Sequence, residues 1–270
     1  MFKRKIEITR IKKHDKTKLI DEVLIEQSVN IFINSEPIVD IICLPKDLRE
    51  LAIGFLYSVG IIDSFEEIKS IEVDEIEYNI YVDLQEAKGF NSENLKINSV
   101  SRVIDTTCGI TSPWRDTIKK VLDEKNVSEQ ILNKNPLLNA DQIYTAIKQM
   151  QTSTSLYRET GGCHGAAIYD FNTKSLSLKE DIGRHNAIDK VLGDLLQKNH
   201  NFQEVLLTST GRLTGDSVLK AIRAQIPIVA SVSAAIESGI RLAFAYGITL
   251  IGFVRGARMN IYTHPERIQI

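Results

Sequence analysis

The sequence predicts a protein of two parts, an N-terminal α+β domain over residues 1–136 and an α/β domain over residues 137–270 with a mixed, mostly parallel sheet. Three observations lead to this prediction. Strand-like segments surround one helical stripe in the first part, and strands alternate with helices in the second. Asn-Lys-Asn-Pro at 133–136 has the composition of a linker. A length of 270 residues gives both parts enough material for a buried core.

Segments rich in β-branched residues, or alternating apolar and polar ones, predict strands in the first part over 6–11, 22–27, 30–33 and 37–44. Asn-Ser-Glu at 34–36 predicts a hairpin turn. A helix then begins at Pro45 or Lys46 and ends near Gly60, with an apolar stripe of Leu48, Leu51, Ala52, Phe55 and Leu56. A further helix opens at Pro113, after two strands over 68–73 and 78–84.

The second part has a more regular order. A helix with Ile143, Ile147 and Met150 in register comes first, followed by a hairpin of strands 166–170 and 176–179. The remaining elements alternate between helix and strand, over 187–197, 205–209, 215–225, 228–233, 236–246 and 249–254. This alternation predicts a largely parallel sheet covered on both faces, with one antiparallel partner from the hairpin.

Composition limits the classes of function. The chain is 43% hydrophobic and 25% charged, which is typical of a soluble globular protein. A net charge of −2 argues against binding of nucleic acid or membrane by bulk electrostatics. The first residues lack the apolar core of a signal peptide, no run approaches membrane-spanning length, and the three cysteines are scattered. We therefore expect a cytoplasmic protein.

The segment 180–190 is the strongest indication of a site. An apolar run ends in two acids, a Gly-Arg-His turn follows, and a helix begins that Asn186 can cap. A helix N-terminus after a strand binds anions, because unpaired N–H groups point outward, and Arg184 and His185 stand where a phosphate would lie. One such turn alone is more often an ordinary capped helix with solvated side chains.

Similar turns recur at the carboxyl ends of the later strands, where α/β sheets bind ligands. Glycine lets backbone approach a ligand closely, and arginine offers paired donors to phosphate oxygens. These turns predict a pocket for a phosphorylated or nucleotide-like ligand, whose identity the residues leave open. The candidate residues are Asp181, Gly183, Arg184, His185, Asn186, Ser209, Gly211, Arg212, Ser231, Arg255, Gly256, Arg258, Met259 and Asn260.

The turn at 160–166 opens the same domain, and its Gly161, Gly162 and His164 are further candidates for the pocket. Cys163 and His164 could be a thiolate or metal site. Neighbouring residues on an extended chain point in opposite directions, however, and no second cluster has metal-ligand spacing. We expect a structural Cys163 and no bound metal.

Cys108 lies in a polar loop just before the predicted helix at Pro113. A thiol near a helix N-terminus is shifted toward the thiolate, which is the nucleophilic form. Cys43, in contrast, lies in an apolar run and is most simply a buried residue. Cys108 is therefore the candidate catalytic residue, although a loop cysteine is more often a bystander.

Three motifs together resemble the formate dehydrogenase accessory sulfurtransferase family (FdhD). They are Thr-Gly-Gly-Cys-His at 160–164, Glu-Asp-Ile-Gly-Arg-His-Asn-Ala at 180–187 and Gly-Phe-Val-Arg-Gly-Ala-Arg-Met-Asn-Ile-Tyr-Thr at 252–263. The resemblance implies a cytidine-deaminase-like, three-layer fold for the second domain. It also implies transfer of sulfur from a cysteine desulfurase to the molybdenum cofactor of formate dehydrogenase. The bis(molybdopterin guanine dinucleotide) form of that cofactor would be bound as a client, the formate dehydrogenase apoenzyme would be served, and a homodimer is implied.

The chain departs from the family at one position. The family loop reads C-G-x-C, whereas residues 108–111 read Cys-Gly-Ile-Thr. Because a hydroxyl cannot hold a persulfide, Thr111 leaves Cys108 as a single sulfur carrier. Two hypotheses stay open: a sulfurtransferase that uses Cys108, with Cys163 as a conceivable second thiol, and a cofactor-binding chaperone without sulfur transfer. A zinc deaminase is rejected, because the H-x-E and P-C-x-x-C motifs are missing.

Overall fold

The computed structural model describes residues 2–85, 103–104, 118, 122, 131 and 138–270. The predicted linker at 133–136 and the predicted helix start at Pro113 lie outside these residues, as do Cys108 and Thr111. The remaining predictions can be compared with the structure element by element.

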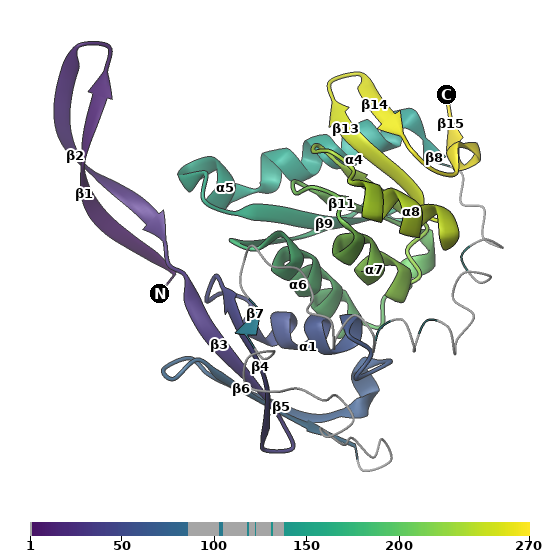
Figure 1. Ribbon diagram of the computed structural model, residues 1–270, viewed down its shortest axis with the longest axis horizontal. Helices are drawn as coiled ribbons and strands as arrows, with labels where there is room; N and C mark the ends of the chain where they lie inside the picture. Colours follow the sequence, from purple (N-terminus) through teal and green to yellow (C-terminus); the bar gives the residue numbers. More distant parts are fainter. Residues whose placement is uncertain (1, 86–102, 105–117, 119–121, 123–130, 132–137) are drawn as a thin grey trace.

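The chain begins with a two-stranded antiparallel ribbon, β1 (Lys3–Lys12) and β2 (Asp15–Leu24), which extends away from the rest of the molecule (Figure 1). The predicted strand over 22–27 is wrong, because Ile25 and Glu26 separate β2 from the next strand. The sequence pattern missed this break because β-branched residues continue across it.

A five-stranded mixed sheet follows, in the order β5-β6-β3-β4-β7. The turn between β3 and β4 places Asn34 and Ser35 at positive φ, which confirms the predicted hairpin. Helix α1 (Leu48–Ser58) packs on this sheet through its apolar stripe. The strands are β3 (Gln27–Ile33), β4 (Glu36–Cys43), β5 (Ile68–Asp74), β6 (Asn79–Leu84) and β7 (Val103–Ile104).

The second sheet has six strands in the order β10-β9-β11-β12-β13-β14. Parallel pairing joins β11 to β12 and β12 to β13, and antiparallel pairing joins β9 to its two neighbours and β14 to β13. The prediction of a mixed sheet is therefore confirmed, but the prediction that it is mostly parallel is wrong, because only two of its five pairings are parallel. Strand β9 is antiparallel to β11 as well as to β10, and β14 is an antiparallel strand that the sequence did not indicate. The strands are β9 (His164–Asp170), β10 (Leu176–Asp181), β11 (Val205–Ser209), β12 (Ile228–Ser231), β13 (Thr249–Arg255) and β14 (Arg258–Ile261).

Helices cover both faces of this sheet, because alternate residues of its strands are apolar and buried. Ile168, Leu207 and Val229 join one apolar cluster with α6 (Arg184–Leu196) and α7 (Gly215–Arg223). Their neighbours on the strands join a second cluster with α4 (Ala140–Ser153) on the other face. Helix α8 (Glu237–Ala245) packs beside α7. Short elements complete the fold: α5 (Ser155–Thr160), which the sequence did not predict, and β8 (Leu138–Asn139) paired with β15 (Ile268–Gln269).

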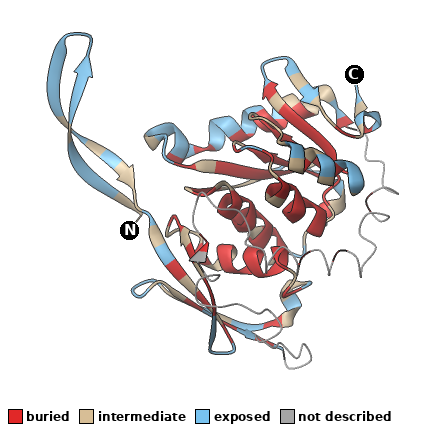
Figure 2. Ribbon diagram, in the orientation of Figure 1, coloured by how far each residue is buried: buried red, intermediate tan, exposed pale blue. Residues whose placement is uncertain are grey.

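The cluster around α6 continues through α1 into the N-terminal sheet, so one buried core spans both parts (Figure 2). Two glycines make the contact between α1 and α6 possible. A Cβ on Gly54 would lie 1.8 Å from the carbonyl oxygen of Asp189, and one on Gly193 would lie 2.0 Å from that of Glu50. The boundary at 136/137 lies outside the described residues, and the division into two domains stays a prediction.

Candidate functional site

The carboxyl ends of β10, β11, β12 and β13 lie at one edge of the sheet. Strands β11 to β13 are parallel, and β10 runs in the same direction because both it and β11 pair antiparallel with β9. The turns that the sequence singled out therefore meet where ligands bind in α/β sheets.

The start of α6 differs from the prediction. Gly183 occupies the N-cap position and Arg184 begins the helix, so the prediction that Asn186 caps it is wrong. The amide of Asn186 instead donates to the carbonyl oxygen of Ile42 at 2.9 Å and to Asp181 Oδ1 at 3.1 Å. No side chain caps the first turn of α6, and its N-terminal N–H groups are left for other acceptors.

Asp181 holds this turn against the N-terminal sheet. Its Oδ1 accepts from Gly183 N at 2.7 Å, and its Oδ2 accepts from Leu44 N at 3.1 Å and lies 2.6 Å from Lys190 Nζ. Both Asp181 and Lys190 are fully buried. Asp181 and Asn186 thus position the turn, and direct contact of either with a ligand stays a prediction.

Arg184 and Arg212 form the cationic part of the edge. Neither makes a salt bridge among the described residues, and the Nε of Arg184 is buried without a hydrogen-bond partner. Burial and the nearby positive charge of Arg212 lower the pKa of Arg184, against the opposing effect of Asp216. A Cβ on Gly211 would lie 2.8 Å from Arg184 Cβ, so only glycine admits the arginine here. Two adjacent guanidinium groups that make no salt bridge among the described residues form a site for an anion.

His185 follows Arg184 in α6 and is almost fully buried. Its Nδ1 is 3.4 Å from Ser217 Oγ, and its Nε2 has no hydrogen-bond partner. Burial, with the charge of Lys220 next in importance, holds the pKa of His185 well below its ordinary value. The ring is therefore neutral at pH 7.

His164 borders a cavity of about 380 Å³ beside this edge. Its Nδ1 lies 3.1 Å from Thr210 Oγ1, which also accepts from Gly165 N at 3.1 Å. Burial, followed by the charge of Arg184, lowers the pKa of His164. The sequence analysis predicted only His164 among the residues around this cavity and missed those that come from the end of α4 and from α5. The cavity is lined by Gln151, Thr154, Tyr157, Arg158, His164, Thr210 and Val232.

Ser209 and Ser231 use their hydroxyl groups inside the strand-end turns. Ser209 Oγ accepts from Gly211 N at 3.0 Å. Ser231 Oγ lies 2.9 Å from the carbonyl oxygen of Ser209 and 2.6 Å from that of Gly211. These bonds fix the backbone next to Arg212, and a role of either hydroxyl in ligand binding stays a prediction.

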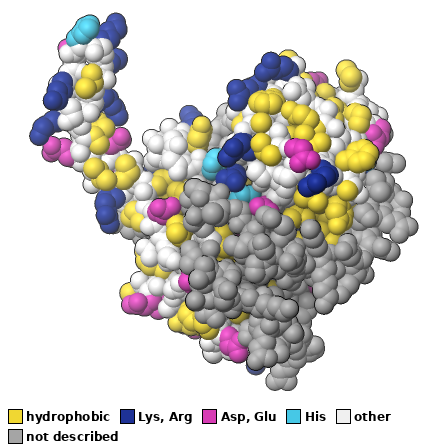
Figure 3. Space-filling model, in the orientation of Figure 1, with side chains coloured by type: hydrophobic (Ala, Val, Ile, Leu, Met, Phe, Trp, Pro, Cys, Tyr) yellow, Lys and Arg dark blue, Asp and Glu magenta, His cyan; other side chains and the backbone are white. Residues whose placement is uncertain are grey.

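The predicted residues on the β13–β14 hairpin form a second basic surface. Arg255, Gly256, Arg258 and Asn260 are exposed, and Met259 is half-buried. The Nε of Arg255 donates to the carbonyl oxygen of Val232 at 3.1 Å, so the hairpin adjoins the cavity beside His164. A smaller cavity of about 230 Å³ includes Gly256 and shares Gln151 with it. Figure 3 shows basic side chains both over this hairpin and lower on the same face, beside histidine.

Comparisons with known proteins show the family of this chain. The FdhD/NarQ family model matches residues 24–269. The chain belongs to the FdhD/NarQ family. Among its relatives, the sulfur carrier protein FdhD of Sulfolobus acidocaldarius is 32% identical, and the match covers 99% of both chains. The Bacillus subtilis protein of the same name is 33% identical over 97% of this chain and 96% of its own. A crystal structure from Desulfotalea psychrophila, assigned as a formate dehydrogenase accessory protein, covers both chains completely with a TM-score of 0.76 and 28% identity.

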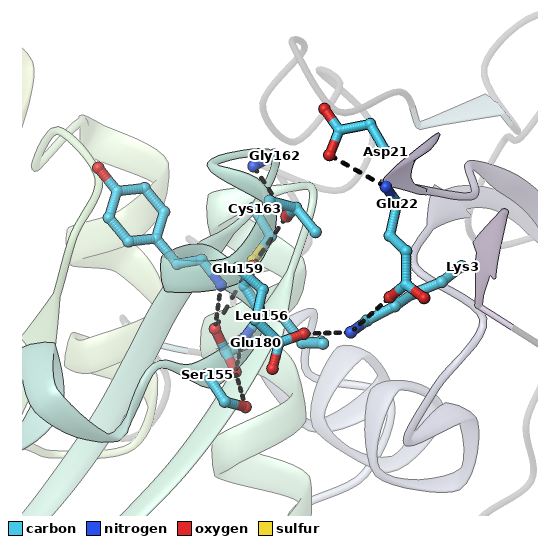
Figure 4. Close-up of polar contacts among 11 residues, drawn as sticks. Lys3, Asp21, Glu22, Ser155, Leu156, Glu159, Gly162, Cys163 and Glu180 are labelled. Atoms are coloured by element: carbon cyan, nitrogen blue, oxygen red, sulfur yellow. Dashed lines mark hydrogen bonds and ion pairs between the residues drawn. The ribbon is translucent and has the colours of Figure 1, made fainter. Parts of the chain in front are cut away.

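Two cysteines of this FdhD/NarQ chain can be placed, and both are buried. Cys43 is fully buried, as predicted, and burial raises the pKa of its thiol. Cys163 Sγ lies 3.6 Å from Glu180 Oε1, and burial, followed by the charge of Glu180, raises the pKa of Cys163 to about 12. Glu180 also accepts from Leu156 N and Tyr157 N at the start of α5 (Figure 4). Cys163 therefore belongs to a structural contact, as predicted.

Gly161 and Gly162 lie between α5 and Cys163 and are exposed. Gly161 ends α5 with a φ of 67°, a conformation that glycine adopts at no steric cost. Contact of either glycine with a ligand stays a prediction.

Within the described residues, no three His, Cys, Asp or Glu side chains are grouped so as to hold a metal ion. That the protein binds no zinc stays a prediction, because part of the chain is not described. No helix in the described part is long and apolar enough to cross a membrane.

Proposed function

We propose that this chain carries sulfur for the maturation of formate dehydrogenase. It accepts sulfur from a cysteine desulfurase on Cys108 and passes it to the bis(molybdopterin guanine dinucleotide) cofactor, which is the bound client of the strand-end edge. The observation that carries the proposal is the unpaired guanidinium of Arg184 beside Arg212, at an uncapped helix start. The names of the relatives support the sulfur-carrying part.

The edge fits the nucleotide end of such a client. A diphosphate needs several N–H donors and positive charge, and Arg184, Arg212 and the first turn of α6 supply both. The adjoining cavity of about 380 Å³ lies within the size range of small-molecule sites. The orphaned Nε atom of Arg184 and Nε2 atom of His185 are polar groups that a ligand could satisfy.

We assign the sulfur chemistry to Cys108 because the other two cysteines are unsuited to it. Cys43 and Cys163 are buried, and both thiols have raised pKa values that disfavour the nucleophilic thiolate. In the proposed step the Cys108 thiolate attacks the terminal sulfur of the donor persulfide. One S–S bond forms at Cys108, the S–S bond of the donor breaks, and the donor cysteine leaves as a thiolate, so that no external oxidant is needed.

Mass spectrometry after incubation with a cysteine desulfurase and free cysteine tests this step. The wild type should gain about 32 Da, one sulfur atom on a thiol. Cys108→Ala should abolish the gain, whereas Cys43→Ala and Cys163→Ala should keep it. A label on Cys163 would refute the assignment to Cys108. A wild type that stays unlabelled, under conditions that charge a relative with both loop cysteines, would favour the chaperone without sulfur transfer.

A further inference from the structure

Glu180, the first of the two acids at the end of β10, is a buried carboxylate without a cationic partner. The residue is 5% exposed and makes no salt bridge with any other residue that the structure describes. Its neighbour Asp181 differs, because Lys190 balances the charge of that carboxylate. A buried ion that lacks a counter-ion has to be stabilised by hydrogen-bond donors. The donors around Glu180 therefore indicate what this carboxylate does.

The donors come from α5 and from the cysteine that follows it (Figure 4). Glu180 Oε1 accepts from Tyr157 N at 2.9 Å, and Oε2 accepts from Leu156 N at 3.1 Å and from Ser155 Oγ at 3.4 Å. Cys163 Sγ lies 3.6 Å from Oε1. The two N–H groups belong to the first turn of α5, where a helix has no acceptor of its own and where negative charge is favourable. Glu180 therefore caps α5 from a different element of the chain.

Helix α5 depends on this support. It has only six residues, and Thr154 at its N-cap position makes no side-chain hydrogen bond to the first turn. Helices of this length are unstable in isolation, because few hydrogen bonds offset the cost of nucleation. On the inner side of α5, Leu156 joins Leu44 and Cys163 in a small apolar cluster. The carboxylate of Glu180 and this cluster together fix the position of the helix.

The other side of α5 forms part of the ligand site. Tyr157 and Arg158 line the cavity of about 380 Å³ beside His164. Tyr157 is 47% exposed, so its ring is open to a flat partner. Besides burial, the charges of Arg184 and Arg212 lower the pKa of His164, which indicates that the cavity adjoins the cationic edge. A nucleotide whose phosphates lie at that edge can therefore reach Tyr157 with its base, and a base stacks favourably on an aromatic ring.

We propose that Glu180 is a positioning residue of the ligand site, whose carboxylate holds α5 so that Tyr157 receives the base of the client nucleotide. The inference rests on the proposed function, because it requires a nucleotide at the strand-end edge. It assigns the two ends of that nucleotide to different parts of the chain. Arg184 and Arg212 bind the phosphates, and α5 binds the base. Glu180 should therefore have no influence on a ligand that consists of phosphates alone.

Titration calorimetry of the full-length chain with guanosine diphosphate and with inorganic pyrophosphate tests this division. Glu180→Ala should raise the dissociation constant of guanosine diphosphate about 5- to 150-fold, the range for a lost stacking contact, and that of pyrophosphate by no more than about twofold. Glu180→Gln keeps one acceptor for the first turn of α5 and should restore part of the affinity. Tyr157→Ala should reproduce the selective loss, whereas Arg184→Ala should weaken both ligands.

Hydrogen exchange, measured by mass spectrometry, shows whether the change is local. In Glu180→Ala the amides of residues 155–161 should exchange faster, whereas those of residues 184–196 should exchange as in the wild type. The matched control is Glu159→Gln, a change of an exposed glutamate on the same helix that pairs with Lys3 at the surface. Because exposed pairs contribute little, this control should bind both ligands like the wild type.

Several results would overturn the inference and leave the proposed function intact. They are unchanged binding of guanosine diphosphate by Glu180→Ala or by Tyr157→Ala, an equal loss of both ligands in either variant, and unchanged exchange over residues 155–161. A wild type that binds guanosine diphosphate but not pyrophosphate at millimolar concentration would overturn the division between base and phosphates. If Glu180→Ala does not fold, Glu180→Gln and Tyr157→Ala decide the question by the same selectivity. A wild type that binds neither ligand would refute the proposed nucleotide site, and the inference with it.

Discussion

Two buried lysines, Lys190 and Lys220, each form a salt bridge with a carboxylate, whereas two arginines at the sheet edge, Arg184 and Arg212, form none among the described residues. Lys220 Nζ lies 2.7 Å from both carboxylate oxygens of Asp189, and Lys190 Nζ lies 2.6 Å from Asp181. Lys220 joins α7 to α6, and Lys190 joins α6 to β10 and to the carbonyl oxygen of Leu44, whereas the arginines remain available to a ligand.

The physical reason lies in what each location allows. A charged side chain inside the core needs an oppositely charged partner, because burial of an unpaired ion lowers the free energy of unfolding by several kcal/mol. A guanidinium at the edge of a sheet can keep partial hydration until an anion displaces the water. An unpaired cation at this edge is therefore tolerated, and four changes test the contrast, from the largest expected effect to the smallest.

Loss of the buried carboxylate should have the largest effect. Asp189→Asn removes the counter-ion of Lys220 and alters the bond with Ser58 Oγ, which lies 2.6 Å from Asp189 Oδ1. We expect the free energy of unfolding in urea to fall by about 3–5 kcal/mol. The matched control is Asp189→Asn/Lys220→Met, in which neither residue of this pair carries a charge and most of the loss should be recovered. Equal losses in the single and double variants would contradict a role for the unpaired charge.

Arg184→Ala should weaken a ligand without unfolding the protein. Titration calorimetry with guanosine diphosphate should show binding weaker by about 1–3 kcal/mol, or about 5- to 150-fold. The free energy of unfolding should change by no more than about 1 kcal/mol, the packing of the arginine stem on Gly211. Arg241→Ala, an exposed arginine on α8, is the control and should bind like the wild type. No binding to the wild type at millimolar ligand would exclude this edge as the nucleotide site.

His185, at the sheet edge, should make the stability of the protein depend on pH. Its folded-state pKa is lowered, chiefly by burial, so the unfolded chain binds the proton first and stability falls as pH drops below the unfolded pKa of about 6.5. At pH 5.5 this group alone should cost about 1.4 kcal/mol relative to pH 8. His185→Gln should remove that component, which urea unfolding at both pH values measures by difference. A variant with the same pH dependence as the wild type would show that the histidine is not buried in its neutral form.

Local patterns were sufficient to predict most of the second sheet. Apolar periodicity located α6, α7 and α8 to within a few residues, and the order of strands indicated which turns would meet. The Gly-Arg turns after β10 and β11 meet at one edge because both strands pair antiparallel with β9 and so run in the same direction. This part of the site could be predicted because it depends on chain direction and not on particular side-chain contacts.

Contacts between distant residues could not be predicted in the same way. Asn186 satisfies every local criterion for an N-cap, yet its amide binds the carbonyl oxygen of Ile42, which belongs to another sheet. Thr210 supports His164, and α5 lines the cavity, although neither has a distinctive local motif. Cys108 remains a prediction from its motif and loop, because it lies outside the described residues.

The smallest effect belongs to a lysine paired at the surface. Lys198 Nζ lies 2.9 Å from Asp194 one helical turn away, and its side chain is 60% exposed. Water and salt screen this pair, and two long side chains lose entropy when they are held together, so exposed pairs at this spacing contribute only about 0.3–0.5 kcal/mol. Lys198→Ala should lower the free energy of unfolding by that amount in low salt. The loss should be smaller at 0.5 M salt, where the Debye length is only roughly 4–5 Å and the attraction between the two charges is screened. A loss above about 2 kcal/mol would mean that pairing, and not burial, explains why the core lysines matter. The distinction drawn between the core lysines and the edge arginines would then fail.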